Sequence, residues 1–225
     1  MSGRKNFVAG EILTAADVNS FLMDQSVMVF DDSAARESAI PTPSEGMVTY
    51  RKDDNAVEVF DGSSFGPIGK ILQVVTAQKT NTFSTTSTSY VDVPGLRVTI
   101  TPVSASNNIL ILGNLTIGHG AAGAIHFRVN GGNASSFVGD AAGSRIRAIG
   151  GGTFSTNDGN PRAKAYSQAI SFVDAPNTTS AVTYDVQIIR GGTSGTVHVN
   201  RTDNDPDSTF YPRGASSITV LEVAG

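Results

Sequence analysis

Two runs of strand-forming residues, separated by a short polar segment, constrain the fold of this chain more than any other feature. Residues 96–101 alternate apolar and polar side chains, so one face of that strand is apolar and the other polar. Residues 109–117 open with four consecutive aliphatic residues, which is typical of a more central strand. Pro102 and a segment rich in Ser and Asn lie between the two runs. We therefore expect the two strands to form an antiparallel, hairpin-like pair.

Further strand-like runs follow throughout the chain beyond residue 70, and no convincing helix interrupts them. Clusters of Gly, Asn, Asp and Pro divide the runs, as expected of an all-β domain. Residues 150–162 begin with three successive glycines and predict a long loop. The fold class predicted for residues 70–225 is an antiparallel β-sandwich, jelly-roll-like. The additional strands are expected at residues 71–76, 90–93, 124–129, 165–173, 182–189, 196–200 and 217–223.

The first 69 residues predict a separate, small α+β module. Within residues 7–25 a short helix is expected, with Thr14 as its N-cap and Asp17 at the third helical position. A brief second helix is expected to be capped by Ser33 and to end before Pro41. Short strands are expected at residues 27–30, 47–50 and 57–60. The apolar residues expected to dock onto a partner are Phe7, Leu13, Val18, Phe21 and Leu22.

Composition narrows the classes of function. The chain has no cysteine, which excludes disulfides, a thiolate nucleophile and a Cys-ligated zinc site. No secretory h-region and no apolar run of about 18 residues is present, so we expect no membrane partner. Residues 1–70 hold 6 Lys/Arg against 11 Asp/Glu (−5), and residues 71–225 hold 10 against 9 (+1). Neither part has the clustered positive charge of a phosphate-backbone binder, so we expect no nucleic acid partner.

Three alternating aspartates form the best candidate for a metal site. Asp203, Asp205 and Asp207 have the spacing that opens a calcium loop. An EF-hand loop needs Gly at its sixth position and Glu at its twelfth, and this chain has Ser208 and Gly214 there. The pattern is therefore a weak cation candidate beside the simpler interpretation, a solvated turn. No cofactor is predicted.

The three histidines, His119, His126 and His198, lack metal-ligand spacing and an adjoining carboxylate in the sequence. His126 and His198 lie in strand-like runs, where a hydrogen-bonded structural histidine is the default interpretation. None of the three is therefore assigned a catalytic or metal-binding role.

Catalytic motifs are also missing from the sequence. There is no Gly-x-Ser-x-Gly elbow, and the glycine-rich residues 191–195 lack the Lys of a phosphate-binding loop. Asp140 could pair with Arg145 and Arg147 across a turn, but such a pair is structural far more often than catalytic. Glu222 is the only Glu after residue 70, so no acid/base pair stands out. We predict that the protein is not an enzyme and assign no catalytic residue.

Two sets of segments resemble known phage proteins. The first part resembles the N-terminal attachment module of structural proteins from tailed bacteriophages. The matching segments are residues 7–19 with the following Phe-Leu-Met, residues 44–48 and residues 57–62. The later part is similar to a widespread family of phage virion proteins. Its matching segments are residues 83–87, 91–101, 139–140, 143–145, 172–176, 183–187, 197–201 and 216–223. The resemblance implies a virion structural protein, assembled in the host cytoplasm, whose N-terminal part binds other virion proteins.

Several functions remain open on this basis. The resemblance favours a tail fibre or receptor-binding protein that displays its sandwich outward, with a host surface glycan as a further partner. Head decoration or a head fibre is the alternative within the same class. A carbohydrate-binding module or a polysaccharide depolymerase is the second alternative. The many Ser, Thr and Gly positions and the few charges suit packing against copies of the same chain, so we expect a homotrimer.

Overall fold

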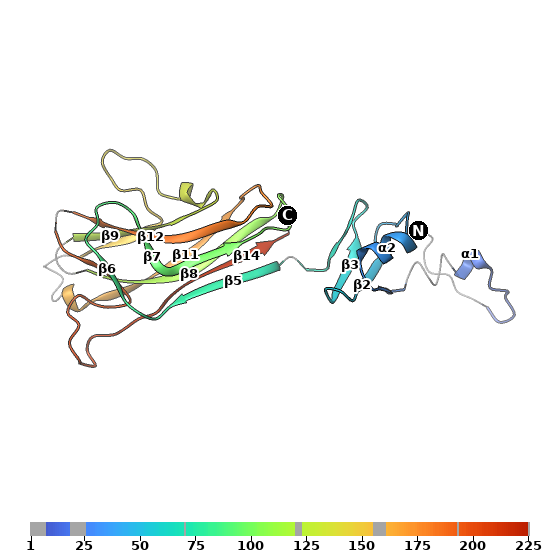
Figure 1. The fold of residues 1–225 in the computed structure, drawn as a ribbon, viewed down its shortest axis with the longest axis horizontal. Helices are drawn as coiled ribbons and strands as arrows, with labels where there is room; N and C mark the ends of the chain where they lie inside the picture. The colour runs from blue at the N-terminus through green and yellow to red at the C-terminus, as the bar shows by residue number, and fades with distance from the viewer. Residues whose placement is uncertain are drawn as a thin grey trace. The chain divides into compact units, whose positions relative to one another are not determined.

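The computed structural model describes residues 8–18, 26–69, 71–119, 123–154, 161–192 and 194–224. The chain divides into two compact units, Met1–Lys70 and Ile71–Gly225 (Figure 1). Among the described residues, no helix has both the length and the apolar character needed to cross a bilayer. The predicted fold class is confirmed: the chain is mainly β, with a jelly-roll-like antiparallel β-sandwich after a small α+β unit.

The first helix, α1 (Ala15–Val18), begins where the sequence predicts. The backbone N of Asp17 donates to Oγ1 of Thr14 at 3.1 Å, and the backbone N of Thr14 donates to Oδ2 of Asp17 at 3.2 Å. This reciprocal capping confirms Thr14 as the N-cap. Of the predicted docking residues, Leu13 is exposed and Val18 is partly buried, whereas Phe7, Phe21 and Leu22 lie outside the described residues.

The first unit contains a four-stranded sheet and one further helix, α2 (Ser33–Ala39). The N-cap of α2 is Asp32, not Ser33 as predicted, because the Asp32 carboxylate accepts the backbone N–H of Ala35 at 2.8 Å. The first strand pairs parallel to the second, and the other pairs are antiparallel. In sheet order the strands are β1 (Met28–Phe30), β2 (Val48–Arg51), β3 (Ala56–Phe60) and β4 (Phe65–Pro67).

A buried ion pair attaches α2 to one face of this sheet. Arg36 of α2 bonds Glu58 of β3, and each side chain is only 8% exposed. The Arg36 guanidinium also lies 4.3 Å from the ring centroid of Phe65. In the described part of the unit, Met47 is the one buried apolar residue, with 7% of its surface exposed. The unit therefore depends on a charged contact more than on a large apolar core.

The opposite face of the small sheet carries exposed valine side chains. Val29 pairs with Tyr50, and Tyr50 pairs with Val57, so these three residues lie on one face. Val29 is 55% exposed and Val57 41% exposed. We call Val29, Tyr50 and Val57 the open face of the first unit.

Two antiparallel sheets form the second unit. In the larger sheet β8 is central: β11 pairs along one edge, β14 and then β13 pair along the other, and β5 and β6 lie outside these. Its strands are β5 (Ile71–Lys79), β6 (Phe83–Thr85), β8 (Asn108–His119), β11 (Ala165–Asp174), β13 (Val197–Val199) and β14 (Ser216–Val223). The smaller sheet has the order β10 (Gly150–Phe154), β9 (Gly123–Asn130), β12 (Val182–Gly191) and β7 (Val91–Ile100). Two 3-10 turns, η2 (Ala134–Ser136) and η3 (Pro161–Ala163), lie in the connections.

The core lies between the two sheets. Alternate residues of β7 and β8 are buried, as their apolar periodicity predicts. Both sheets contribute to one apolar cluster, in which Tyr184 and Phe127 are the largest fully buried side chains. Burial of each such side chain contributes about 1.5–3 kcal/mol to folding, so this cluster dominates the stability of the second unit.

The predicted hairpin between residues 96–101 and 109–117 is wrong. β7 pairs with β12 in the smaller sheet, whereas β8 lies in the larger one. The connection between them crosses from sheet to sheet and is held by Glu222 of β14. Its carboxylate accepts the backbone N–H of Val103 at 2.7 Å and Nδ2 of Asn107 at 2.6 Å. β7 and β8 therefore contribute their apolar faces to the same core from two different sheets.

Residues 90–93 and 96–101, predicted as two strands, form the single strand β7. Its pairing with β12 shifts register between Asp185 and Gln187, opposite Pro94 and Gly95. Pro94 lacks a backbone N–H, and Gly95 has φ of +88°, a left-handed conformation that suits glycine. The two residues produce a β-bulge and do not end the strand.

The loop predicted at residues 150–162 begins as a strand. β10 pairs with β9 along its whole length, and the described part resumes at η3. Side chains would not fit here: a Cβ at Gly150 would lie 2.8 Å from the ring of Phe127, and one at Gly151 would lie 2.2 Å from the carbonyl O of Ile125. The glycines therefore permit close strand packing, although in a sequence they indicate a loop. The short strands β4 and β6 were also not predicted.

Candidate functional site

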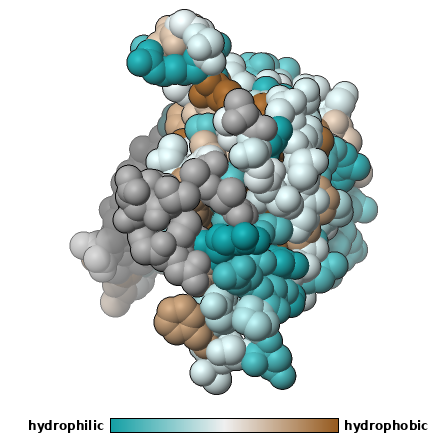
Figure 2. Space-filling model, turned by 90° about the vertical axis from the view of Figure 1, so that its left-hand side faces the viewer, coloured by the Kyte–Doolittle hydropathy of each residue, from teal (hydrophilic) through white to brown (hydrophobic). Residues whose placement is uncertain are grey.

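The best candidate for a binding site is an open groove of about 560 Å³ beside the glycine strand β10. Its walls are the loop of residues 139–148, which rises above the sandwich in Figure 1, and strands β9 and β10. Ile125 and Phe127 point into the core, so His126 between them points to the outer face of the sheet. Figure 2, which views the molecule from the left of Figure 1, shows mainly hydrophilic surface among the described residues.

His126 lies on the sheet in a space that two glycines leave free. A Cβ at Gly151 would lie 2.9 Å from Nδ1 of the imidazole, and one at Gly191 would lie 2.8 Å from Nε2. Gly151 is the direct partner of His126 on β10, and Gly191 lies on β12. Partial burial lowers the pKa of His126 below its ordinary value of 6.5, so the ring is neutral at pH 7. Among the described residues neither ring nitrogen has a hydrogen-bond partner, which leaves one donor and one acceptor for a ligand.

Two exposed arginines lie on the loop side of the groove. Arg147 donates from Nε to the carbonyl O of Gly139 at 2.7 Å, and the backbone N of Gly139 donates to the carbonyl O of Ala148 at 3.1 Å. Nη1 of Arg145 has a long contact of 3.5 Å to the carbonyl O of Ala142.

The pairing considered for Asp140 with Arg145 and Arg147 is not present in the described part of the chain. Arg147 bonds a backbone carbonyl across its turn and not the carboxylate. Asp140, Arg145 and Arg147 all line the groove. The groove therefore contains two cations and one carboxylate that remain accessible to a ligand.

Side chains on the sheet hold this loop in place. The hydroxyl of Tyr90 donates to the carbonyl O of Arg147 at 2.7 Å. The Arg128 guanidinium lies 4.1 Å from the centroid of the Tyr90 ring, and its Nε donates to Oε1 of Gln187 at 2.8 Å. The loop that bears the arginines is thus tied to β9 and β12 through Tyr90, which reduces the ordering cost of binding a ligand.

A second cluster joins Ser84, His198 and Asp203. Oγ of Ser84 lies 2.7 Å from Nδ1 of His198, and Nε2 of His198 lies 2.9 Å from Oδ1 of Asp203. Arg162 donates from Nε to Oδ2 of Asp203 at 2.5 Å. His198 is thus hydrogen-bonded, as expected of a structural histidine, and its carboxylate partner is not adjacent in the sequence. Sequence inspection could have flagged Asp203, five residues after His198, but not Ser84, which lies 114 residues earlier.

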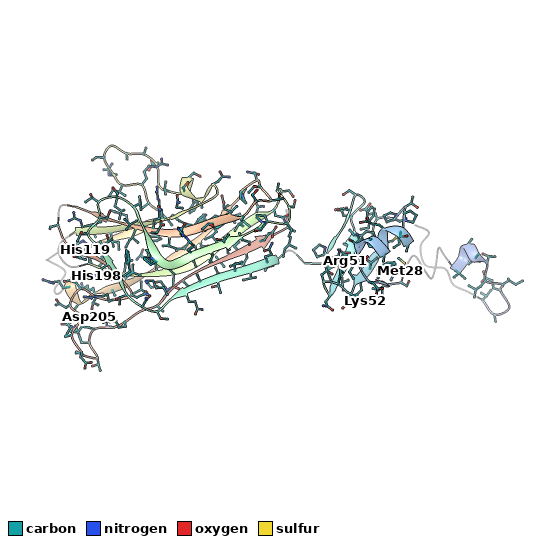
Figure 3. All side chains as sticks on the ribbon, viewed as in Figure 1. Met28, Arg51, Lys52, His119, His198 and Asp205 are labelled. Atoms are coloured by element: carbon teal, nitrogen blue, oxygen red, sulfur yellow. The ribbon has the colours of Figure 1, made fainter. Side chains whose placement is uncertain are left out.

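The geometry of this cluster favours a structural role. Ser84 and His198 are direct partners in the antiparallel pair β6–β13, so their contact is an ordinary cross-strand contact. Asp203 then connects the imidazole to the loop that follows β13. His198 lies with His119 at the same end of the sandwich (Figure 3). The groove described above shares no residue with the cluster.

Protonation of His198 should weaken the fold. Burial lowers its pKa from 6.5, although the hydrogen bond to Asp203 opposes that shift. Below pH 6.5 the unfolded chain binds more protons than the folded chain, so stability is lost as the pH falls through this range. We expect the free energy of unfolding, measured by urea titration, to fall more between about pH 7.5 and 5.5 in the wild type than in His198→Gln. Equal falls would contradict a buried neutral imidazole at this position.

The three aspartates proposed as a cation site do not converge. Asp203 bonds His198, and Asp205 pairs with Arg213, whose Nε lies 2.9 Å from Oδ1. Asp207 is exposed. Among the described residues, no group of three acidic or histidine side chains could hold a metal ion. Figure 3 shows Asp205 in its loop beneath the histidine end of the sandwich.

The fold and the groove define a two-unit, mainly β protein with a ligand-sized groove on its sandwich. No protein-family model matches the sequence, and no curated protein matches it. Among solved structures, the chain is similar to chains of infectious bursal disease virus. These are the Gx strain (14% identity, TM-score 0.32, 75% of this chain and 39% of that chain), the Gt strain (10%, 0.34, 76% and 47%) and the VP2 subviral particle (12%, 0.31, 77% and 45%). This chain covers less than half of each of these three chains.

Proposed function

We propose that this protein is a structural component of a tailed bacteriophage particle, attached by its first unit and displaying its sandwich outward. The observation that carries this proposal is the open face of the first unit. Val29 and Val57 lie exposed on a sheet whose other face is covered by α2. A small unit with a single buried apolar residue in its described part gains stability when such a face packs against a partner.

Two sequence features support attachment through this unit. Its segments at residues 7–19, 44–48 and 57–62 resemble phage attachment modules. Its net charge of −5, against +1 for residues 71–225, favours a partner surface of positive charge, which would speed association more than it strengthens binding.

The sandwich suits outward display, because it has its own core and is a separate compact unit. Within the proposal the protein is a homotrimeric tail fibre or receptor-binding protein that carries out no catalysis and contacts the host surface. The groove at His126 favours this assignment over head decoration, since decoration alone requires no ligand site. A depolymerase would need paired carboxylates, and Asp140 is the one acidic residue among the described residues that line the groove.

A density map of intact phage particles tests the proposal. We expect the sandwiches to project from the tail in groups of three, with the first unit in contact with another virion protein. Light scattering of the purified protein should likewise give the mass of a trimer. Density on the head would favour decoration instead, and absence of the protein from purified particles would contradict the proposal.

A further inference from the structure

We propose that the groove lined by His126, Asp140, Arg145 and Arg147 binds an acidic sugar residue, a hexuronate unit of a polysaccharide. The inference deepens the proposed function, on which it rests for its biological setting. The chemistry that recognises the ligand comes from the groove alone. Its volume of about 560 Å³ lies within the range of roughly 300–1000 Å³ typical of small-ligand sites.

The arginines define the charge of the ligand. Arg145 and Arg147 are exposed and form no ion pair within the described residues, so both guanidinium groups can meet an anion. A guanidinium binds a planar carboxylate through two parallel hydrogen bonds. Because Tyr90 bonds the carbonyl O of Arg147, the loop is already fixed before a ligand arrives.

The remaining polar groups suit hydroxyls. Asp140 adds a carboxylate that accepts hydrogen bonds from sugar hydroxyls and would repel a second negative charge. His126 offers one donor and one acceptor, since its ring is neutral and unpartnered among the described residues. A sugar hydroxyl can both donate and accept a hydrogen bond, so it can bond to either ring nitrogen of His126.

The floor and wall of the groove suit a flat, polar ring. β10 is the edge strand of its sheet, and its run of glycines presents backbone with no side chains in the way. Ile146, 36% exposed, supplies an apolar contact from the loop. The groove therefore combines a bare floor, hydroxyl-binding groups and a carboxylate-binding pair.

Phosphate compounds fit these groups less well. Among the described residues, the lining has no Lys and no helix N-terminus of a phosphate-binding loop, and no Phe, Tyr or Trp to stack on a base. Asp140 would also oppose a dianion more than a monoanion. A singly charged, hydroxyl-rich ligand is therefore favoured over a phosphate or a nucleotide.

Calorimetric titration of the full-length protein with trigalacturonate tests the inference. We expect saturable binding by the wild type and a loss of affinity of about tenfold or more in Arg145→Gln, because a charge-assisted hydrogen-bond pair is removed. Arg145 is exposed and has a single long contact, so this variant should fold normally. Arg213→Gln removes the same charge from another exposed loop and should bind like the wild type.

Any of these results would overturn the inference: no binding of trigalacturonate by the wild type, equal binding by Arg145→Gln, or equal binding of the neutral galactose trimer. Inorganic phosphate is the third ligand to be titrated. If it binds as tightly as trigalacturonate with the same dependence on Arg145, the groove is a general anion site and the sugar assignment is wrong. Incorporation into particles is measured separately, so a protein that binds the sugar but is absent from particles would refute the proposed function alone.

Discussion

Glu222→Ala is expected to lower the free energy of unfolding by about 3–5 kcal/mol, because it removes a buried carboxylate that accepts three hydrogen bonds. Glu222 is fully buried, and its carboxylate accepts hydrogen bonds from Val103, Asn107 and Gln73. Two of these donors belong to the connection that carries the chain from one sheet to the other. Urea titration followed by circular dichroism would measure the loss.

Glu222→Gln provides a matched comparison. The remaining amide oxygen can still accept from Val103 and Asn107, but the amide nitrogen would face Nε2 of Gln73, so we expect a smaller loss than with alanine. Asp207→Ala changes an exposed carboxylate in the same unit and should stay within about 0.5 kcal/mol of the wild type. A loss below about 1 kcal/mol for Glu222→Ala would show that the connection is held by other contacts.

Deletion of residues 1–25 is expected to abolish incorporation into particles while leaving the sandwich folded and oligomeric. The deletion removes α1 and its cap but none of the apolar cluster of the second unit. Complementation of a phage that lacks the protein, followed by analysis of purified particles, measures incorporation. Normal incorporation would place the attachment surface elsewhere and would contradict the role proposed for the N-terminal segment.

The open face allows a sharper test of attachment. Val29→Asp with Val57→Asp places two charges on the face proposed to meet the partner, so incorporation should fall about tenfold or more. Val74→Asp with Val173→Asp makes the same chemical change at two exposed valines of the sandwich and should leave attachment intact. Equal effects of the two pairs would indicate general damage to the protein and not a specific docking face.

Local patterns in the sequence were sufficient to predict the class of fold and the positions of most strands. The alternation in residues 96–101 identifies the buried face of β7, because side chains of a strand point alternately to its two sides. Thr14 and Asp17 identify the start of α1, because a capping pair lies within four residues of chain. Each of these signals depends on neighbours in the sequence.

The sequence did not show which strands pair with each other. Periodicity shows which face of β7 and of β8 is buried, but both faces meet the same core whether the strands lie in one sheet or in two. The connection that crosses between the sheets is bonded to Glu222, more than 100 residues away in the sequence. The glycines of β10 indicated a loop because their close contacts with Phe127 and Ile125 exist only once β9 lies beside them.

The sequence by itself determined the β-sandwich class, the small first unit and the N-cap of α1, since apolar periodicity and capping act over a few residues. Only the tertiary structure brought Arg145 and Arg147 above His126, and Ser84 beside His198. Such sites join segments that are distant in the chain, and their geometry follows from sheet order and register. A single sequence carries no direct signal of either, because many pairings of the same strands would bury the same apolar faces.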